Sequence, residues 1–280
     1  MGYGKAIPNM DVRTTKQPRA RGAVRLRFER GNAGTRLSGL HQSGSLRALF
    51  PRGGAKALQA VLTNTSGGVT GGDRFETEIV VDAGARATLT TQAAERAYRA
   101  QPGQVGRIRT RASVAGGGRL NWLPQETILF DGCDLDRRIE VALEADGSLL
   151  LVEPLVFGRT AMGEVVRQGR FCDHVEISRG GRLVFLDRVL LDGDIAAVLD
   201  RPAIAAGGCA AALVVFVDAS AERRLDAVRA GLPEAAGVSL IAPDIMVMRL
   251  VAQDGFALRA GLLPAIDALH DEILPRPWMI

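Results

Sequence analysis

The densest run of residues that could do chemistry is a glycine-rich segment, Thr-Asn-Thr-Ser-Gly-Gly-Val-Thr-Gly-Gly-Asp at residues 63–73. A glycine-rich loop that cradles phosphate needs a lysine after its last glycine and a hydroxyl residue for magnesium. Here the glycines end at Asp73, whose carboxylate would repel phosphate. The segment therefore predicts either tight turns and close backbone approach, or a surface on which the glycines hold Asp73 rigidly.

Metal sites need imidazole, thiolate or carboxylate ligands that converge. The chain has three histidines and three cysteines, which are widely separated: His41, His174, His270, Cys133, Cys172 and Cys209. The one local candidate is Cys172-Asp173-His174. Successive residues of a strand point to opposite faces, so Cys172 and His174 share a side that Asp173 cannot join. We interpret this trio as structural, with a metal site as the alternative, and the cysteines as reduced thiols.

Paired carboxylates offer a different chemistry, the hydrolysis of a polysaccharide. The acidic residues that would serve are Glu126, Asp131, Glu153 and Glu164. A carbohydrate-active enzyme built on a β-solenoid is therefore an alternative function. Against it, only 5% of the residues are aromatic, whereas sugar clefts usually expose aromatic rings. The sequence also contains no Gly-x-Ser-x-Gly elbow to present a serine nucleophile.

One pattern recurs along the chain and indicates the elements that position these residues. An apolar residue and two variable residues precede a two-residue turn, usually with glycine, and then a strand of alternating apolar positions. The four copies start at Val81, Val114, Leu143 and Ile177, which are 33, 29 and 34 residues apart. Glycine supplies the positive φ of tight hairpin turns, and units of this length bury their apolar faces by stacking. The pattern predicts a mainly β fold, a stacked β-solenoid or layered sandwich.

Helices are expected to be few and late. Residues 220–231 read as one, with Ser220 as N-cap, Leu225 and Val228 facing the core, and a glycine as the stop. A second is expected to run from Pro264 to about Ile273. Residues 93–100 have helical composition but lie between strands, so their structure is left open. The domain prediction is a disordered basic leader at residues 1–20 and a single β domain at residues 21–280.

Charge is divided unevenly along the chain. Residues 1–140 hold 22 basic and 12 acidic side chains, and residues 141–280 hold 13 and 19. A nucleic-acid-binding module is thus a third hypothesis, but few aromatic residues are present to stack on bases, so no nucleic-acid partner is expected. The sequence shows neither the long apolar run of a membrane helix nor a signal peptide, so we expect a cytoplasmic protein that does not bind membranes.

Four segments taken together resemble one known family, the urease accessory protein UreD (UreH) family. They are residues 64–73 with the glycine cluster, residues 89–99 (Leu-Thr-Thr-Gln-Ala-Ala through Tyr-Arg), residues 123–132 (Leu-Pro-Gln-Glu-Thr-Ile-Leu-Phe-Asp-Gly) and residues 153–164 (Glu-Pro-Leu-Val-Phe-Gly-Arg-Thr-Ala-Met-Gly-Glu). Their order and spacing are specific, whereas the glycine cluster alone is weak. The resemblance runs from about Arg21 to the C-terminus.

The resemblance implies a β-solenoid with about two C-terminal helices and no catalytic activity of its own. It implies a urease maturation factor that binds UreF and, through UreF, the GTPase UreG, and that is dimeric within this hetero-complex. The complex would dock on urease apoprotein and help to deliver nickel to its active site. No cofactor would be bound stably, and nickel would be held only in transit. GTP hydrolysis would belong to UreG, which agrees with the missing phosphate loop.

The resemblance also implies an internal tunnel for nickel, which polar residues inside an apolar solenoid would mark. Carboxylates suit transient passage because they bind nickel more weakly than imidazole or thiolate does. The candidates for this path or for a partner surface are Asp73, Glu126, Asp131, Glu153, Arg159 and Glu164. Structural alternatives stay open: Asp131-Gly132 as an ordinary turn, and an ion pair between Glu153 and Arg159.

Overall fold

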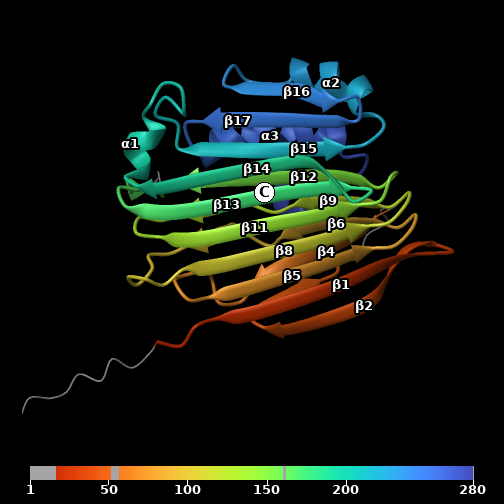
Figure 1. Cartoon of the computed structure of the whole chain (residues 1–280), viewed down its shortest axis with the longest axis horizontal. Helices are drawn as coiled ribbons and strands as arrows, with labels where there is room; N and C mark the ends of the chain where they lie inside the picture. The colour runs from red at the N-terminus through yellow and green to blue at the C-terminus, as the bar shows by residue number, and fades with distance from the viewer. Residues whose placement is uncertain (1–16, 52–56, 160–161, 280) are drawn as a thin grey trace, which may run out of the picture.

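The computed structural model describes residues 17–51, 57–159 and 162–279. Two long β-sheets lie face to face and are coiled together by the chain, with helices over one of them (Figure 1). Strands make up 53% of the structure, and the stacked coils make about four turns, so the predicted mainly β solenoid is confirmed. Most of the predicted leader lies outside the described residues, and β1 begins directly after it, at Arg21.

The first sheet has seven strands in the order β14-β13-β11-β8-β5-β1-β2. Their bounds are β1 (Arg21–Gly31), β2 (Gly34–Gly44), β5 (Arg74–Val81), β8 (Gly106–Val114), β11 (Asp134–Leu143), β13 (Gly169–Arg179) and β14 (Arg182–Gly193). The strands from β1 to β13 in this order run parallel to one another, because each belongs to a successive coil of the chain. Antiparallel β2 and β14 close the two edges.

The second sheet has ten strands, eight of them in the order β16-β17-β15-β12-β9-β6-β4-β3. Their bounds are β3 (Leu46–Leu49), β4 (Leu58–Asn64), β6 (Arg86–Thr91), β9 (Arg119–Leu123), β12 (Ser148–Phe157), β15 (Ala210–Val217), β16 (Ala236–Ala242) and β17 (Ile245–Ala252). Two short strands, β7 (Glu95–Ala97) and β10 (Thr127–Leu129), extend its coils. Residues 93–100, left open by the sequence, thus contain a strand.

The sequence repeat corresponds to the coil of the solenoid. Val81 pairs with Val114, and Val114 pairs with Leu143, so the starts of three copies lie side by side. The prediction that these copies are hairpins is wrong, because each of their turns carries the chain from the first sheet to the second. Their strands find partners in the neighbouring coils instead. Only the fourth copy, after Ile177, forms a hairpin, which joins β13 to β14.

Buried and exposed side chains alternate along the strands, so each strand turns one apolar face toward the opposite sheet. In β1 the apolar residues Val24, Leu26 and Phe28 are at most 2% exposed, while the arginines between them face solvent. Complete burial of such a side chain stabilises the fold by about 1.5–3 kcal/mol. These residues belong to a core that fills the space between the two sheets.

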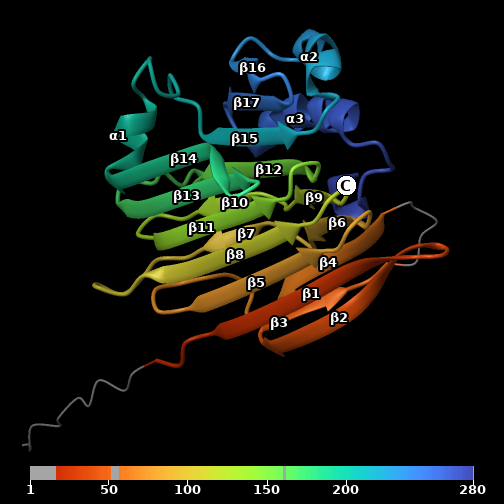
Figure 2. The same cartoon turned by 45° about the vertical axis from the view of Figure 1, so that its right-hand side comes forward.

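A second core lies on the opposite face of the second sheet. β12 contributes to both cores, since Leu149 and Leu151 point between the sheets while Leu150 and Val152 point outward. Two helices, α2 (Ala221–Ala230) and α3 (Gly255–Leu269), cover this outward face (Figure 2). A strand buried on both faces needs a nearly continuous apolar run, and from Leu149 to Phe157 β12 is interrupted only by Glu153.

Helix α2 (Ala221–Ala230) agrees with its prediction in extent and in the burial of Val228, and Leu225 packs against the second core. Ser220 occupies the N-cap position, yet its hydroxyl makes no capping hydrogen bond. It donates instead to Asp218 at 2.5 Å. A short helix that the sequence analysis missed, α1 (Ile195–Leu199), begins after Asp194, which caps it.

Helix α3 (Gly255–Leu269) corrects the second helix prediction. Pro264 lies inside the helix rather than at its start, and Ile273 lies beyond its end with 77% of its surface exposed. The helix begins nine residues earlier because the Asp254 carboxylate accepts a hydrogen bond from the Ala257 amide at 2.8 Å. No helix among the described residues combines the length and the apolar character needed to cross a bilayer.

Removal of this cap should destabilise the protein. We expect Asp254→Ala to lower the free energy of unfolding by about 1 kcal/mol, since a helix amide loses its acceptor. Asp267→Ala is the matched control, because Asp267 is exposed near the C-terminal end of the same helix, where a negative charge opposes the helix dipole. Urea denaturation of both variants checks the prediction, which fails if the two midpoints shift equally.

Candidate functional site

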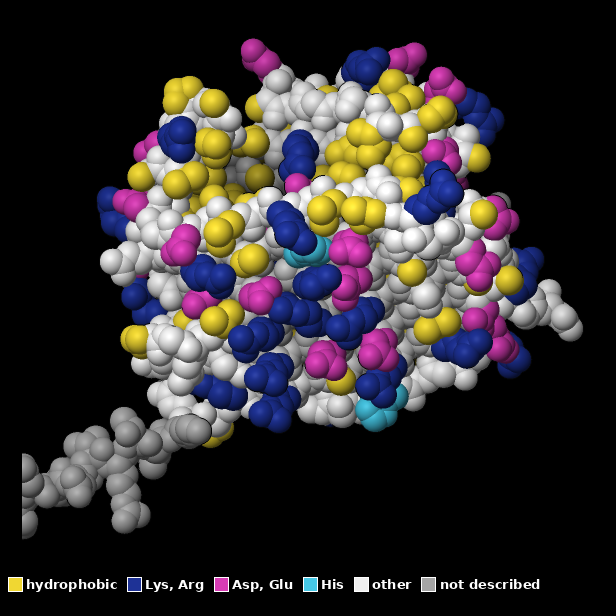
Figure 3. All heavy atoms as spheres, in the orientation of Figure 1, with side chains coloured by type: hydrophobic (Ala, Val, Ile, Leu, Met, Phe, Trp, Pro, Cys, Tyr) yellow, Lys and Arg dark blue, Asp and Glu magenta, His cyan; other side chains and the backbone are white. Residues whose placement is uncertain are grey.

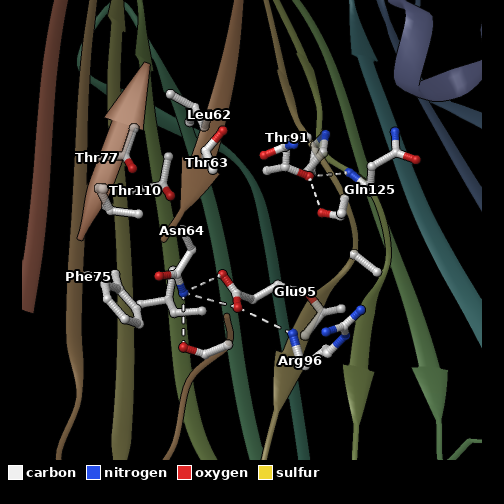
Figure 4. Close-up of a pocket in the computed structure, with 18 of the residues that line it drawn as sticks. Leu62, Thr63, Asn64, Phe75, Thr77, Thr91, Glu95, Arg96, Thr110 and Gln125 are labelled. Carbon is white, nitrogen blue, oxygen red and sulfur yellow. Dashed lines mark hydrogen bonds between the residues drawn. The ribbon is translucent and has the colours of Figure 1, made fainter. Parts of the chain in front are cut away.

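A cavity of about 180 Å³ lies between the two sheets, and we call it the central cavity. Its wall contains the hydroxyl groups of Thr77 and Thr110 from the first sheet, and it is large enough for several water molecules (Figure 4). Its lining runs from buried Arg137 and Glu153 to exposed Gln92, so the cavity reaches the surface. An interior of this kind combines apolar walls with a few polar groups.

Two buried residues of the lining, Arg137 and Glu153, belong to a network of buried charges that also includes Asp173. Arg137, Glu153 and Asp173 are 4%, 3% and 7% exposed. The Arg137 guanidinium donates two hydrogen bonds to the Asp173 carboxylate, at 2.9 and 2.6 Å, and contacts Glu153 at 2.5 Å. A third donation goes to the Thr127 hydroxyl at 3.3 Å. One cation therefore faces two carboxylates, which leaves the network with one excess negative charge when both are ionised.

Glu153 is the member of this network whose ionisation is least favoured. Burial raises the pKa of Glu153 to about 7, because a carboxylate in this interior loses its hydration. Arg137 opposes the rise, but its charge is shared with Asp173. The Trp122 indole donates to the other Glu153 oxygen at 2.6 Å and holds the side chain in place.

The raised pKa of Glu153 predicts how stability depends on pH. An unfolded glutamate titrates near pH 4.3, so between about pH 4.5 and 7 the folded state retains a proton that the unfolded state has lost. The stability that the bound proton contributes is fully present below this range and is lost as the pH rises through about 7. We expect the free energy of unfolding of the wild type, relative to Glu153→Gln, to fall by up to about 1.4 kcal/mol per pH unit. Urea denaturation of both proteins across this range is the measurement, and parallel curves would contradict the prediction.

A second carboxylate, Glu95, lies closer to the mouth of the cavity. The Asn64 side-chain amide lies 3.2 Å from each of its oxygens, and the two side chains face each other from β7 and β4 (Figure 4). Burial raises the pKa of Glu95, and the Asn64 hydrogen bond opposes the rise. Two buried polar atoms in the same wall, Thr63 Oγ1 and Gln125 Nε2, have no hydrogen-bond partner among the residues that the structure describes. Unpaired groups of this kind suit a cavity that holds water or a polar guest.

Asp73 lies outside the wall of the central cavity and connects two segments of backbone. It is 5% exposed, and its two oxygens accept hydrogen bonds from the Ala20 amide at 2.7 Å and the Thr70 amide at 2.9 Å. The carboxylate thereby ties the start of β1 to the glycine-rich loop. Gly68 allows this loop to pack closely, since a Cβ there would lie 2.4 Å from the Tyr98 ring. The reading of the glycines as a close backbone approach is confirmed at this position.

Three further candidates, Asp131, Arg159 and Glu164, meet along one edge of the solenoid, where successive coils pass from the second sheet back to the first. Arg159 pairs with Glu164 at 2.9 Å and stacks over the Phe130 ring, and Asp131 pairs with Arg99. Hydrogen bonds from the Gln168 amide hold the pKa of Asp131 below its ordinary value. This cluster is a surface feature rather than part of the central cavity.

The suggested ion pair between Glu153 and Arg159 is wrong. Glu153 points into the interior from β12 toward Arg137, and Arg159 lies beyond the end of that strand. Six residues of extended chain span about 20 Å, which no side chain bridges.

Glu126 anchors helix α3 to the solenoid. Its carboxylate accepts a hydrogen bond from Arg259 at 3.2 Å, and Arg259 also stacks over the ring of buried Trp278. Of the six sequence candidates, Glu153 alone is in the wall of the central cavity.

The trio Cys172-Asp173-His174 divides between two faces, as the strand geometry predicts. Asp173 points inward to Arg137, and His174 lies on the outer face, 3.1 Å from Glu176. No group of three or more His, Cys, Asp and Glu side chains in the described part of the chain is placed to hold a metal ion.

The sequence model of the UreD urease accessory protein family matches residues 20–279. The chain belongs to that family. It is 55% identical to the urease accessory protein UreD of Ruegeria pomeroyi over 87% of this chain and 95% of that protein. It is 49% identical to the UreD of Roseobacter denitrificans, over 94% and 96% of the two chains.

The sequence analysis missed three charged residues of this UreD family member: Arg137, Asp173 as an interior charge, and Glu95. A signal was present for two of them. Arg137 falls in phase with the buried residues Leu135 and Ile139 of β11. Asp173 falls in phase with the buried apolar residues of β13 in the same way. Opposite charges at the inward positions of neighbouring strands indicate a buried ion pair. Glu95 lies in a strand of three residues, too short to show a phase.

Proposed function

We propose that this protein acts in urease maturation as a non-catalytic subunit of an accessory complex with UreF and UreG. The complex docks on urease apoprotein and helps to deliver nickel to the active site. Membership of the UreD family over nearly the whole chain supports the role in maturation. A cytoplasmic location and a dimeric arrangement within the complex stay predictions.

Nickel is the cargo in this proposal, and it crosses the central cavity. The observation that carries this step is the pair of carboxylates in the cavity wall, Glu95 near the mouth and Glu153 at depth. The charge of Arg137, which also lines the cavity, is shared between Glu153 and Asp173. Carboxylate oxygens attract a divalent cation but release it more readily than imidazole or thiolate does. The threonine hydroxyls of Thr77 and Thr110 supply further weak oxygen partners along the way.

Deletion of the gene in the organism that encodes the chain tests the maturation role. We expect urease protein to accumulate without activity, and activity to return when the full chain is restored. Co-purification of the tagged chain with UreF tests the complex separately. Full urease activity in the deletion strain at low nickel would refute the maturation role, and the absence of UreF from the purified complex would refute the assembly.

A further inference from the structure

The outer face of the first sheet carries charges in rows that run across the strands. One row contains Arg25, Glu78, Arg111 and Glu140, which are direct neighbours on β1, β5, β8 and β11. Its charges alternate, with Arg25 bonded to Glu78 at 2.9 Å and Arg111 bonded to Glu140 at 3.0 Å. We call it the alternating row. In this row both arginines form ion pairs with carboxylates of the same sheet.

A second row on the same face has a different composition. Arg21 pairs in register with Arg74, and Arg74 with Arg107, so three arginines stand side by side on β1, β5 and β8. We call this the arginine row. Neighbouring strands are about 4.8 Å apart, and like charges placed directly opposite destabilise a sheet.

No acidic side chain in the described ranges forms an ion pair with Arg21, Arg74 or Arg107. The next residue along the row is Asp136, but its carboxylate is bonded to Arg109 at 2.8 Å. The arginine row thus keeps three cations side by side, none of them in an ion pair with a described carboxylate.

This row is open to solvent. Arg21 and Arg74 are exposed, and Arg107 is half-buried. Over the beginnings of β1, β5 and β8, at the lower left of the sheet, basic side chains gather with few acidic ones among them (Figure 3). The leader does not supply the missing charge, since residues 1–16 contain three basic residues and only one acidic residue.

We propose that the arginine row is the docking surface for an acidic helix of a partner protein. Carboxylates three or four residues apart on a helix lie about 5–6 Å from one another, close to the spacing of the arginines across the strands. Alternate residues of an extended strand are about 6.7 Å apart and would fall out of step. A single phosphate would engage one or two arginines of a flat row, whereas a line of carboxylates engages all three. Binding relieves the repulsion that the free protein tolerates.

The test uses the full chain and two synthetic helical peptides, one with glutamates at positions i, i+4 and i+7 and one with glutamines there. We expect the glutamate peptide alone to bind, with an affinity that falls as salt is added. Arg74→Gln should weaken this binding about threefold, and Arg21→Gln/Arg74→Gln/Arg107→Gln about 20-fold, as measured by fluorescence anisotropy. Arg74→Gln should at the same time raise the melting temperature of the free protein, because it removes the centre of the repulsion.

Arg111→Gln is the matched control. Arg111 lies on the same face, but between Glu78 and Glu140, so its replacement should leave peptide binding within about twofold and lower the melting temperature. Equal weakening by Arg111→Gln, or unchanged binding by the triple variant, would overturn the proposal. Displacement of the peptide by inorganic phosphate, at concentrations where chloride of equal ionic strength has no effect, would identify a small-anion site and also overturn it.

Discussion

Arg137→Met should lower the free energy of unfolding by about 3–5 kcal/mol. Its guanidinium is the only cation in contact with the Glu153 and Asp173 carboxylates among the described residues. Methionine keeps an unbranched apolar stem but leaves two carboxylates buried without a counter-charge. Because the free energy of unfolding of native proteins is about 5–15 kcal/mol, this loss would remove a large part of it. Urea denaturation gives the value.

Arg138→Met provides the control for this experiment. Arg138 is the next residue of β11, but it points outward, where its side chain is 41% exposed and pairs with Glu140. We expect this substitution to change stability by no more than about 1 kcal/mol. In a Glu153→Gln/Asp173→Asn background, Arg137→Met should have a smaller effect, since neutral partners no longer need the cation. Equal losses for Arg137→Met in both backgrounds would show that packing, and not charge, is what the arginine supplies.

Glu153→Gln should reduce urease activation about tenfold at limiting nickel, which corresponds to about 1.4 kcal/mol of lost attraction for the cation in transit. Glutamine keeps the shape of the side chain and leaves Arg137 paired with Asp173. The variant should fold well, because it replaces a carboxyl group that burial holds partly protonated near neutral pH. Excess nickel should restore part of the activity. The measurement is urease activity per urease protein in cells that carry the variant.

Glu164→Gln is the comparison for this second experiment. Glu164 is a sequence candidate of the same type, but it lies between β12 and β13 in an ion pair with Arg159, outside the central cavity. We expect activation to stay within about twofold of the wild type. Should Glu153→Gln activate urease normally at limiting nickel, with the variant present at wild-type levels, the cavity would not be the route of the metal.

Much of the fold follows from local patterns in the sequence. The spacing of Val81, Val114 and Leu143 predicts stacked coils because each copy buries its apolar positions against the next, and the structure pairs these residues directly. What the pattern does not contain is the partner of each strand. The local pattern therefore predicts hairpins, although in three copies the turns cross between the two sheets. Pro264 predicts a helix start because proline is favoured in the first turn, but the helix begins at Gly255, after the cap at Asp254.

The candidate site was harder to predict for a physical reason. Carboxylates are recognisable in a sequence, but whether one lies inside depends on pairing between strands that are far apart in the chain. Glu153 and Arg137 come from opposite sheets, and Asp173 comes from the following coil. The inward phase of Arg137 in β11 was the usable clue. Asp131 and Glu164 have similar local sequence character and lie at the surface.

The double burial of β12 has a consequence for how the chain is made. Its outward residues Leu150 and Val152 are covered by strands and helices that begin only at β15 (Ala210–Val217) and end with α3 (Gly255–Leu269). During synthesis the coils can stack as they leave the ribosome, but this apolar wall stays bare until the last quarter of the polypeptide has emerged. A nascent chain halted before that point exposes this apolar surface to solvent. The longer the chain stays in that state, the longer chaperones and proteases can bind it.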